Sequence, residues 1–411
     1  MNAAGTATWV NALHEELVRR MDLRRNAIEH LDEHSFRLHA RAQLRSLIAS
    51  NPLPPNVDAD EVERRVLQDC VGLGVLEDLL ADDTVSEIMV NGPERLFIER
   101  SGRLLAVDRH FPSESALRSV IERLLNPTGR RVDEASPMAD ARLRDGSRLN
   151  VVIPPLAVKG TSLTIRRFGR RRLGLTDLLA SGALSQAMAS LLHEAAKRRL
   201  NVVISGGTAT GKTTLLNALA SMIPASDRVI TIEDAAELAL DRDNLVALEA
   251  RPGNIEGSGR VSIRDLLRNA LRMRPDRIVV GECRGGEALD MLQAMNTGHS
   301  GSLTSVHANS PRDALSRLEV MSLMAGLDLP LAAVRGQIAS AVGLIVQVER
   351  FACGSRRVVE IAEVTGMEQG VIQSQRLFHF QVVHRPGEGP VRGEFVASPL
   401  PPRFLEQEGA W

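Results

Sequence analysis

The stretch that decides the fold is Leu200-Asn-Val-Val-Ile-Ser-Gly-Gly-Thr-Ala-Thr-Gly-Lys-Thr-Thr214. Its first part, up to Ser205, is a short apolar and β-branched run, which is typical of a buried parallel strand. A glycine-rich turn follows, and residues 215–222 then have helical spacing. The sequence therefore predicts a strand, a loop and a helix in immediate succession.

The loop satisfies the phosphate-binding pattern G-x-x-x-x-G-K-[ST]. Glycines let backbone N–H groups curl around phosphate oxygens, the lysine reaches the β- and γ-phosphates, and the threonine hydroxyl ligates Mg²⁺. The helix N-terminus adds positive partial charge. A glycine-rich turn without a ligand is the alternative, and the flanking strand and helix disfavour it. We expect a nucleoside triphosphate to bind here, with Thr213 as the metal ligand. The expected binding residues are Gly206, Gly207, Thr208, Ala209, Thr210, Gly211, Lys212, Thr213 and Thr214.

Composition limits the possible partners. The 411 residues include 50 basic and 51 acidic side chains, a net charge of −1, so no global field attracts nucleic acid or anionic lipid. The three cysteines, Cys70, Cys283 and Cys353, form no C-x-x-C pair, which favours a reducing compartment and excludes a tetracysteine zinc module. No stretch of 18 apolar residues is present, and residues 1–20 lack a basic segment followed by an apolar one, so we expect no secretion leader. We expect a cytoplasmic protein whose membrane contact comes only through partners.

The pattern along the chain predicts several domains. Residues 1–70 have helical spacing and predict a small helical bundle; a basic amphipathic membrane helix is the alternative, which the acidic residues of this segment disfavour. Residues 71–168 read as an α/β domain of short strands, including a hairpin at Asp145-Gly146. Residues 169–174 are a basic linker. Residues 175–384 alternate apolar strands with helices, the pattern of a parallel sheet with helices on both faces, although the runs at 345–348, 358–364 and 377–383 read as antiparallel strands. The proline-rich residues 385–411 predict a loose tail.

Polar side chains follow three of the predicted strands. These strands are 229–232, 278–280 and 303–306. Glu233 follows the first, Glu282 the second and His307 the third. Because ligands bind outside the carboxyl ends of strands in an open parallel sheet, we expect these side chains at the same edge as the phosphate loop. Taken singly, each carboxylate could cap a helix or form an ion pair, and His299 and His307 could each be structural.

A further helix is predicted over residues 262–273. Its apolar residues lie on one face and its arginines on the other, where solvated charge is one interpretation. The arginines are Arg264, Arg268 and Arg272.

Three further motifs resemble the boxes of the type II/IV secretion ATPases. They are Arg228-Val-Ile-Thr-Ile-Glu-Asp-Ala-Ala-Glu-Leu238 (Asp box), Leu271-Arg-Met-Arg-Pro-Asp-Arg-Ile-Val-Val-Gly-Glu282 (Walker B) and Thr297-Gly-His-Ser-Gly-Ser-Leu-Thr-Ser-Val-His-Ala-Asn309 (His box). Val85-Ser-Glu-Ile-Met-Val-Asn-Gly-Pro93 and Asp140-Ala-Arg-Leu-Arg-Asp-Gly-Ser-Arg148 resemble the Tad (Flp) pilus assembly branch. The resemblance covers residues 71 to about 365.

The resemblance implies a RecA-like ATPase domain, a PAS-like N-terminal α/β domain and a homohexameric ring. It implies ATP and Mg²⁺ as cofactors, and work on an inner-membrane pilus or secretion platform protein. Glu233 and Glu282 would prepare the attacking water, and His299 and His307 would sense the γ-phosphate. Arg142 and Arg148 would contact nucleotide from the N-terminal domain. The chain has Gly281 where a Walker B aspartate is expected in phosphate-loop ATPases generally, which leaves one metal contact unassigned.

Two other classes of protein share parts of this pattern. A RecA-like nucleic-acid translocase has the same core, since a fold does not choose its cargo. The near-zero net charge and an aromatic content of only 3% disfavour it, and no direct nucleic-acid contact is expected. A nucleotide-gated scaffold that binds ATP without turnover is disfavoured by the complete set of candidate catalytic residues.

Overall fold

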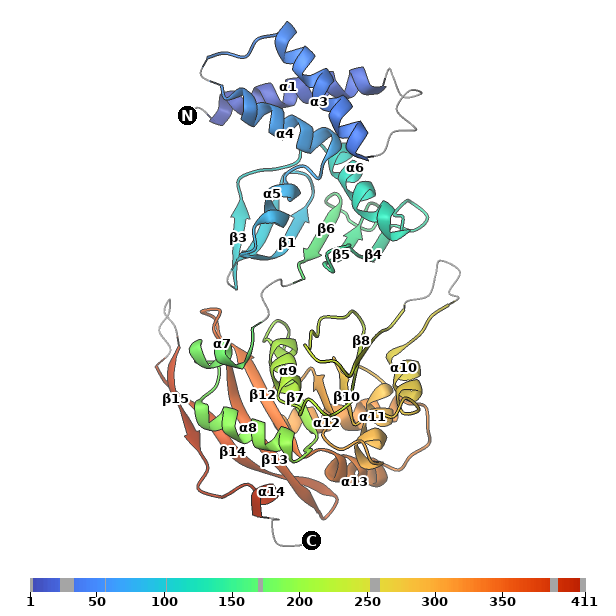
Figure 1. Cartoon of the computed structure of the whole chain (residues 1–411), viewed down its shortest axis with the longest axis vertical. Helices are drawn as coiled ribbons and strands as arrows, with labels where there is room; N and C mark the ends of the chain where they lie inside the picture. Colours follow the sequence, from blue (N-terminus) through green and yellow to red (C-terminus); the bar gives the residue numbers. More distant parts are fainter. Residues whose placement is uncertain are drawn as a thin grey trace. The chain divides into compact units, whose positions relative to one another are not determined.

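A computed structural model describes residues 3–22, 33–55, 57–100, 102–168, 173–251, 259–384 and 391–406. The chain divides into two compact units, Met1–Arg170 and Arg171–Trp411 (Figure 1). Residues 169–172 of the predicted linker lie outside the described residues. The domain boundaries at residues 70, 168 and 384 stay predictions.

The first unit begins with a bundle of three helices. They are α1 (Ala3–Asp22), α3 (Glu33–Ser50) and α4 (Ala59–Val71). Leu17, Leu44 and Val66 are fully buried in one shared core. The Asp58 carboxylate caps α4 by accepting hydrogen bonds from the backbone N–H groups of residues 60 and 61. The bundle buries Val10, Leu13 and Leu17 of α1. No helix in the described part of the chain is both long and apolar enough to cross a bilayer.

A six-stranded antiparallel sheet follows, in the order β3-β2-β1-β6-β5-β4. Its elements are α5 (Leu76–Ala81), β1 (Val85–Asn91), β2 (Leu96–Arg100), β3 (Arg103–Val107), α6 (Glu114–Leu125), the 3₁₀ turn Asn126–Thr128, β4 (Met138–Arg142), β5 (Arg148–Val152) and β6 (Ser162–Arg166). Helix α6 buries Leu117 and Ile121 against the sheet. Ser113 caps this helix, and Gly146 takes a φ of +89° in the hairpin turn, as the sequence predicts. This arrangement agrees with the PAS-like α/β fold.

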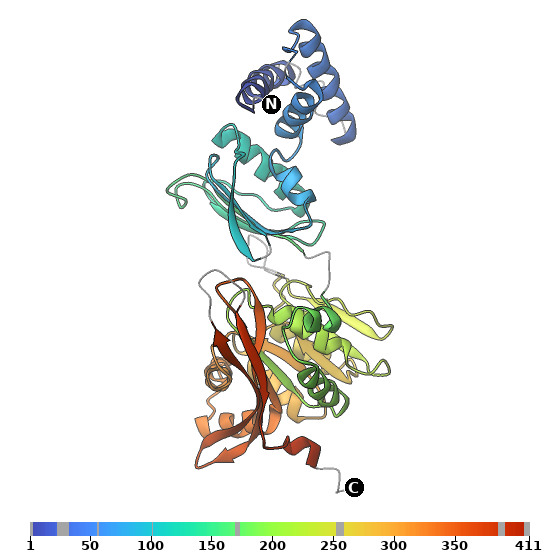
Figure 2. The same cartoon turned by 90° about the vertical axis from the view of Figure 1, so that its left-hand side faces the viewer.

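The second unit is built on a nine-stranded sheet in the order β15-β14-β13-β12-β7-β11-β10-β8-β9. Its strands are β7 (Val202–Gly206), β8 (Val229–Glu233), β9 (Leu245–Glu249), β10 (Arg277–Val280), β11 (Leu303–Val306), β12 (Leu344–Arg350), β13 (Arg356–Glu368), β14 (Val371–His384) and β15 (Arg392–Ala397). Its helices are α7 (Leu175–Ala180), α8 (Gln186–Lys197), α9 (Lys212–Ser221), α10 (Ile263–Ala270), α11 (Glu287–Asn296), α12 (Pro311–Leu323), α13 (Leu331–Ala341) and α14 (Arg403–Glu406). The six strands from β12 to β9 are parallel. Figure 2 shows the long strands β13 and β14 that extend the sheet.

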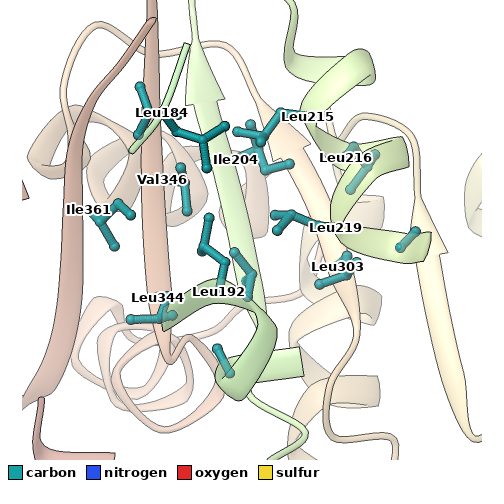
Figure 3. Packing of buried hydrophobic residues seen from close by; sticks show 14 of the residues in the cluster. Leu184, Leu192, Ile204, Leu215, Leu216, Leu219, Leu303, Leu344, Val346 and Ile361 are labelled. Atoms are coloured by element: carbon teal, nitrogen blue, oxygen red, sulfur yellow. The ribbon is translucent and has the colours of Figure 1, made fainter. Parts of the chain in front are cut away.

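The parallel strands β7, β8 and β10 are buried on both faces, as their apolar runs predict. Ile204 of β7 packs with α8 and α9 on one face, where Leu192, Leu216 and Leu219 surround it (Figure 3). Its neighbour Val203 points to the other core, which α10, α11, α12 and α13 complete. The fold is therefore the RecA-like arrangement that the sequence predicts.

One strand prediction needs correction, and one strand was not predicted. The run at 345–348 reads as an antiparallel strand, but β12 is antiparallel only to β13 and is parallel to β7. Strand β12 thus ends the parallel part of the sheet and begins the antiparallel extension. Strand β9 was not predicted, because it lies at the edge of the sheet and its side chains are only partly buried or exposed.

The expected loose tail is wrong for residues 391–406. Strand β15 pairs with β14, and α14 follows it. The buried carboxylate of Glu363 on β13 accepts hydrogen bonds from the backbone N–H groups of Arg403 and Phe404, both at 2.9 Å. The proline content of this segment suggested that it has no regular structure. The prolines at 399–402 lie between β15 and α14, so they interrupt neither element.

Helix α10 is shorter than predicted and ends before Arg272, and its two arginines are not simply solvated. Arg264 Nε lies 2.7 Å from Asp290 Oδ2, and Arg268 Nε lies 2.9 Å from Asp290 Oδ1. These ion pairs join α10 to α11.

Candidate functional site

The strand order brings the predicted functional residues to one edge of the nine-stranded sheet. Strands β7, β11, β10 and β8 are consecutive neighbours. Val306 lies opposite Ser205, and Val280 lies opposite both Thr304 and Ile232, so the carboxyl ends of the four strands are level. The residues at or just beyond these ends are Gly206, His307, Glu282 and Glu233.

The phosphate loop has a backbone that its sequence explains. Ala209 has φ +57° and Gly211 has φ +94°, both in the left-handed region. A Cβ at Gly206 would lie 2.6 Å from the carbonyl oxygen of Val348, so no larger residue fits there. Helix α9 begins directly after the loop, with Thr213 and Thr214 in its first turn. Its first N–H groups have no partner within the helix and are suited to an anion.

Lys212 lies folded onto its own loop. Its Nζ donates hydrogen bonds to the carbonyl oxygens of Gly206 and Gly207, both at 3.0 Å. The side chain is only 8% exposed. A phosphate bound in the loop would offer this buried ammonium a charged acceptor in place of two neutral carbonyls, and hydrogen bonds between ions are the stronger ones.

Glu282 lies between a guanidinium and an imidazole. Its Oε2 accepts hydrogen bonds from Arg284 Nε at 3.1 Å and Nη2 at 2.9 Å, and its Oε1 lies 3.0 Å from His307 Nε2. Arg284 Nη1 also lies 3.5 Å from Asp234 Oδ2. Sequence reasoning missed Arg284, although its position two residues after Glu282 was a signal that the two side chains could meet.

His307 interacts electrostatically with Glu282 on the neighbouring strand end and with Lys212 of the phosphate loop. Burial lowers the pKa of His307, Glu282 raises it, and Lys212 lowers it further. The net shift is downward, so the imidazole is mainly neutral at pH 7. A neutral imidazole can donate one hydrogen bond without adding a charge beside the lysine.

Glu233 is buried and has backbone partners. Its Oε1 accepts hydrogen bonds from the N–H groups of Glu237 and Leu238, both at 3.1 Å. A Cβ at Gly281 would lie 3.0 Å from Glu233 Cγ and 3.4 Å from Glu233 Oε1. The glycine in Walker B therefore leaves room for the side chain of Glu233, which a larger residue at position 281 would crowd.

The structure does not bring His299 to this edge. Its backbone carbonyl accepts a hydrogen bond from Ser302 Oγ, and Ser302 N donates to Asn201 Oδ1 at the start of β7. His299 therefore lies at the amino edge of the sheet, one strand length or roughly 13 Å from the phosphate loop. His299 does not lie beside the phosphate loop of its own chain, and its role in sensing the γ-phosphate stays a prediction.

Arg142 and Arg148 lie in the first unit and face each other across the hairpin of β4 and β5. Arg166 of β6 is opposite Arg148 on the other side, so three arginines form one row across three strands. Sequence reasoning did not single out Arg166, whose alignment with the other two depends on strand register.

The residues at the edge suit a hard divalent cation. The Thr213 hydroxyl and the carboxylates of Glu233 and Glu282 are the oxygen donors that Mg²⁺ prefers. Within the described ranges, no three His, Cys, Asp or Glu side chains form a cluster that could hold a metal by themselves.

Comparison with known proteins places these features in a family. Residues 69–383 match the family described as type II/IV secretion system protein. The chain is 41% identical over 322 residues to a Mycobacterium tuberculosis protein provisionally named a conjugal transfer protein, and the match covers 77% of this chain and 91% of that one. It is 31% identical over 322 residues to the type IV secretion system protein VirB11 of Bartonella quintana, with 69% and 89% covered.

Among solved structures, the ATPase DotB of Yersinia pseudotuberculosis superposes with a TM-score of 0.50 at 17% sequence identity. The match covers 70% of this chain and 77% of that chain. At this identity the likeness concerns the fold.

Proposed function

The chain belongs to the type II/IV secretion system protein family, and from this premise we propose that it hydrolyses ATP to drive protein secretion or pilus assembly. The observation that carries the proposal is the arrangement at the sheet edge. Lys212 is buried on a phosphate loop, while Glu282 and His307 contact each other at 3.0 Å on the next strand ends. A phosphate-binding group thus stands beside groups that can orient a water molecule, which is most of what phosphoryl transfer requires.

The proposed roles follow from these surroundings. Lys212 and the loop N–H groups bind the β- and γ-phosphates. Glu282 orients the attacking water, and His307 holds the Glu282 carboxylate and meets the γ-phosphate. Glu233 supports the site from behind by fixing the backbone at 237 and 238.

Thr213 would be the direct protein ligand of Mg²⁺, with Glu233 and Glu282 in reach of its water ligands. The ion would neutralise charge on the phosphate oxygens. Phosphate binding and orientation of the attacking water would be carried out by groups of the protein itself.

The finer assignment is to the Tad (Flp) pilus assembly branch, supported by the two motifs at 85–93 and 140–148. In this proposal six copies form a ring in the cytoplasm, bound to an inner-membrane platform protein. Recovery of a polytopic platform protein with the tagged chain from membranes would support it, and recovery of DNA instead would contradict it.

The test of the core proposal is Mg²⁺-dependent ATP hydrolysis by the purified chain and by Lys212→Ala. Loss of the ammonium removes the main phosphate contact, so turnover is expected to fall on the order of 10²-fold or more. Lys197→Ala, which changes an exposed lysine of α8 in the same unit, is the matched control and is expected to keep full activity. Near wild-type turnover by Lys212→Ala would show that the site is wrongly placed.

A nucleic-acid translocase is the second candidate, and the name of the Mycobacterium relative favours keeping it. The same assay separates the two functions. Single-stranded DNA is expected to leave ATP turnover unchanged; strong stimulation would favour the translocase.

A further inference from the structure

The hairpin of β12 and β13 lies against the phosphate loop at two points. On β12, Val348 pairs with Gly206, the first residue of the loop. On β13, Arg356 Nε donates a hydrogen bond of 3.0 Å to the carbonyl oxygen of Ala209, a residue 147 positions away in sequence. Both the start and the middle of the loop therefore form hydrogen-bonded contacts with this hairpin.

Arg356 contacts the part of the loop with the least favourable backbone. Ala209 holds a φ of +57°, which residues with a Cβ rarely adopt, and its carbonyl is the group that Arg356 holds. The same side chain passes over Gly211, because a Cβ there would lie 3.2 Å from Arg356 Cδ. The Arg356 side chain thus contacts the loop at two of its left-handed residues, Ala209 and Gly211.

Two side chains of the loop itself also hold its carbonyl groups. Lys212 Nζ holds the carbonyls of Gly206 and Gly207, and Thr210 Oγ1 donates to Gly207 O at 3.0 Å. When Lys212 turns to a phosphate, its two contacts are given up. The contact from Arg356 reaches Ala209 from outside the loop and does not compete with the ligand.

We propose that Arg356 is a positioning residue for nucleotide binding, which keeps the loop in its receiving conformation through the Ala209 carbonyl. The inference rests on the proposed function, because it requires ATP at this loop. It makes the antiparallel extension of the sheet part of the nucleotide site. It predicts that Arg356 affects affinity for any nucleotide with a β-phosphate and has little effect on the chemical step.

The first test compares nucleotide affinity and turnover in Arg356→Ala. Loss of a hydrogen bond from a charged donor is expected to raise the Kd for fluorescent ATP and ADP analogues about tenfold, by the same factor for both. The kcat at saturating ATP is expected to change less than about twofold. Arg376→Ala is the matched control, since Arg376 is also an exposed arginine of the extension and pairs with Glu360. It is expected to leave both values unchanged.

The second test uses Ala209→Gly, because glycine adopts a positive φ without help. In that background Arg356→Ala is expected to raise the Kd by only about twofold. An equal tenfold loss in both backgrounds, or a loss confined to ATP, would mean direct contact with the nucleotide and would overturn the inference. An unchanged Kd in Arg356→Ala would overturn it as well. If the wild-type chain binds neither analogue, the proposed function fails and the inference falls with it.

Discussion

At the residue scale, the absence of a side chain at Gly281 leaves room for the neighbouring side chain of Glu233. A Cβ at Gly281 would lie 3.0 Å from Glu233 Cγ, closer than ordinary van der Waals contact. Gly281→Ala is therefore expected to displace Glu233, to lower the free energy of unfolding by about 1–3 kcal/mol and to reduce ATP turnover. Thermal denaturation and an ATPase assay would measure both.

The control for this change is Gly336→Ala in α13. A Cβ at Gly336 would meet nothing within 4 Å, and alanine is favoured over glycine in a helix by about 1 kcal/mol. Gly336→Ala is expected to be neutral or stabilising. If the two alanine variants behave alike, the space at Gly281 does not confine Glu233.

The two candidate carboxylates differ in what surrounds them. Glu282 contacts Arg284 and His307, whereas Glu233 accepts hydrogen bonds from backbone N–H groups. Glu282→Gln is expected to bind ATP normally and to lose about 10²-fold or more in single-turnover hydrolysis, because a positioned carboxylate is worth that much in proton transfer. Glu233→Gln is expected to keep more activity, since an amide oxygen can still accept from the backbone. The opposite order of rates, at equal ATP binding, would exchange the two roles.

At the scale of elements, Glu363 of β13 fastens the C-terminal segment to the sheet. Its carboxylate accepts from the N–H groups of Arg403 and Phe404 and from Gln375 Nε2. Glu363→Ala would remove the acceptor of two partly buried backbone N–H groups, while Gln375 Nε2 would keep the carbonyl oxygen of Pro401 as a second acceptor. The expected cost is about 1 kcal/mol for each lost hydrogen bond. Trypsin is then expected to cut at Arg403 much faster than in the wild-type chain, with ATP turnover unchanged. Glu368→Ala, at the exposed end of the same strand, is the control. Equal cleavage rates in all three proteins would contradict this role.

Elements could be predicted from sequence where local pattern and burial agree. Strand β7 and helix α9 were predictable because a buried apolar run, a glycine loop and helical spacing follow one another within 20 residues or so. The direction of β12 was not predictable, because it is set by its partner β7 and not by its own residues. Contacts such as that of Arg356 with Ala209 depend on the same strand order, which local sequence does not encode.

At the scale of the whole molecule, the residues that we propose for nucleotide turnover belong to two separate units. The phosphate loop lies in the second unit, and the row of Arg142, Arg148 and Arg166 lies in the first. The phosphate loop and the arginine row can act on one nucleotide only if a first unit and a second unit close around it. These two units could belong to one copy or to neighbouring copies in a ring. Closure of this kind would link nucleotide turnover to movement of the units, which is what a motor needs.

The final prediction concerns that closure. An arginine that reaches a transferring phosphoryl group late in the reaction stabilises developing charge, so Arg148→Ala is expected to lower kcat on the order of 10³-fold while ATP affinity changes little. Arg103→Ala, on the exposed strand β3 of the same sheet, is the control and is expected to keep its activity. Light scattering after size exclusion would establish whether the active species is a ring of six copies. Full activity in a strictly monomeric protein would contradict the ring. An equal loss from Arg148→Ala and Arg103→Ala would contradict an arginine that acts by closure, because the loss would then not depend on an arginine that reaches the nucleotide.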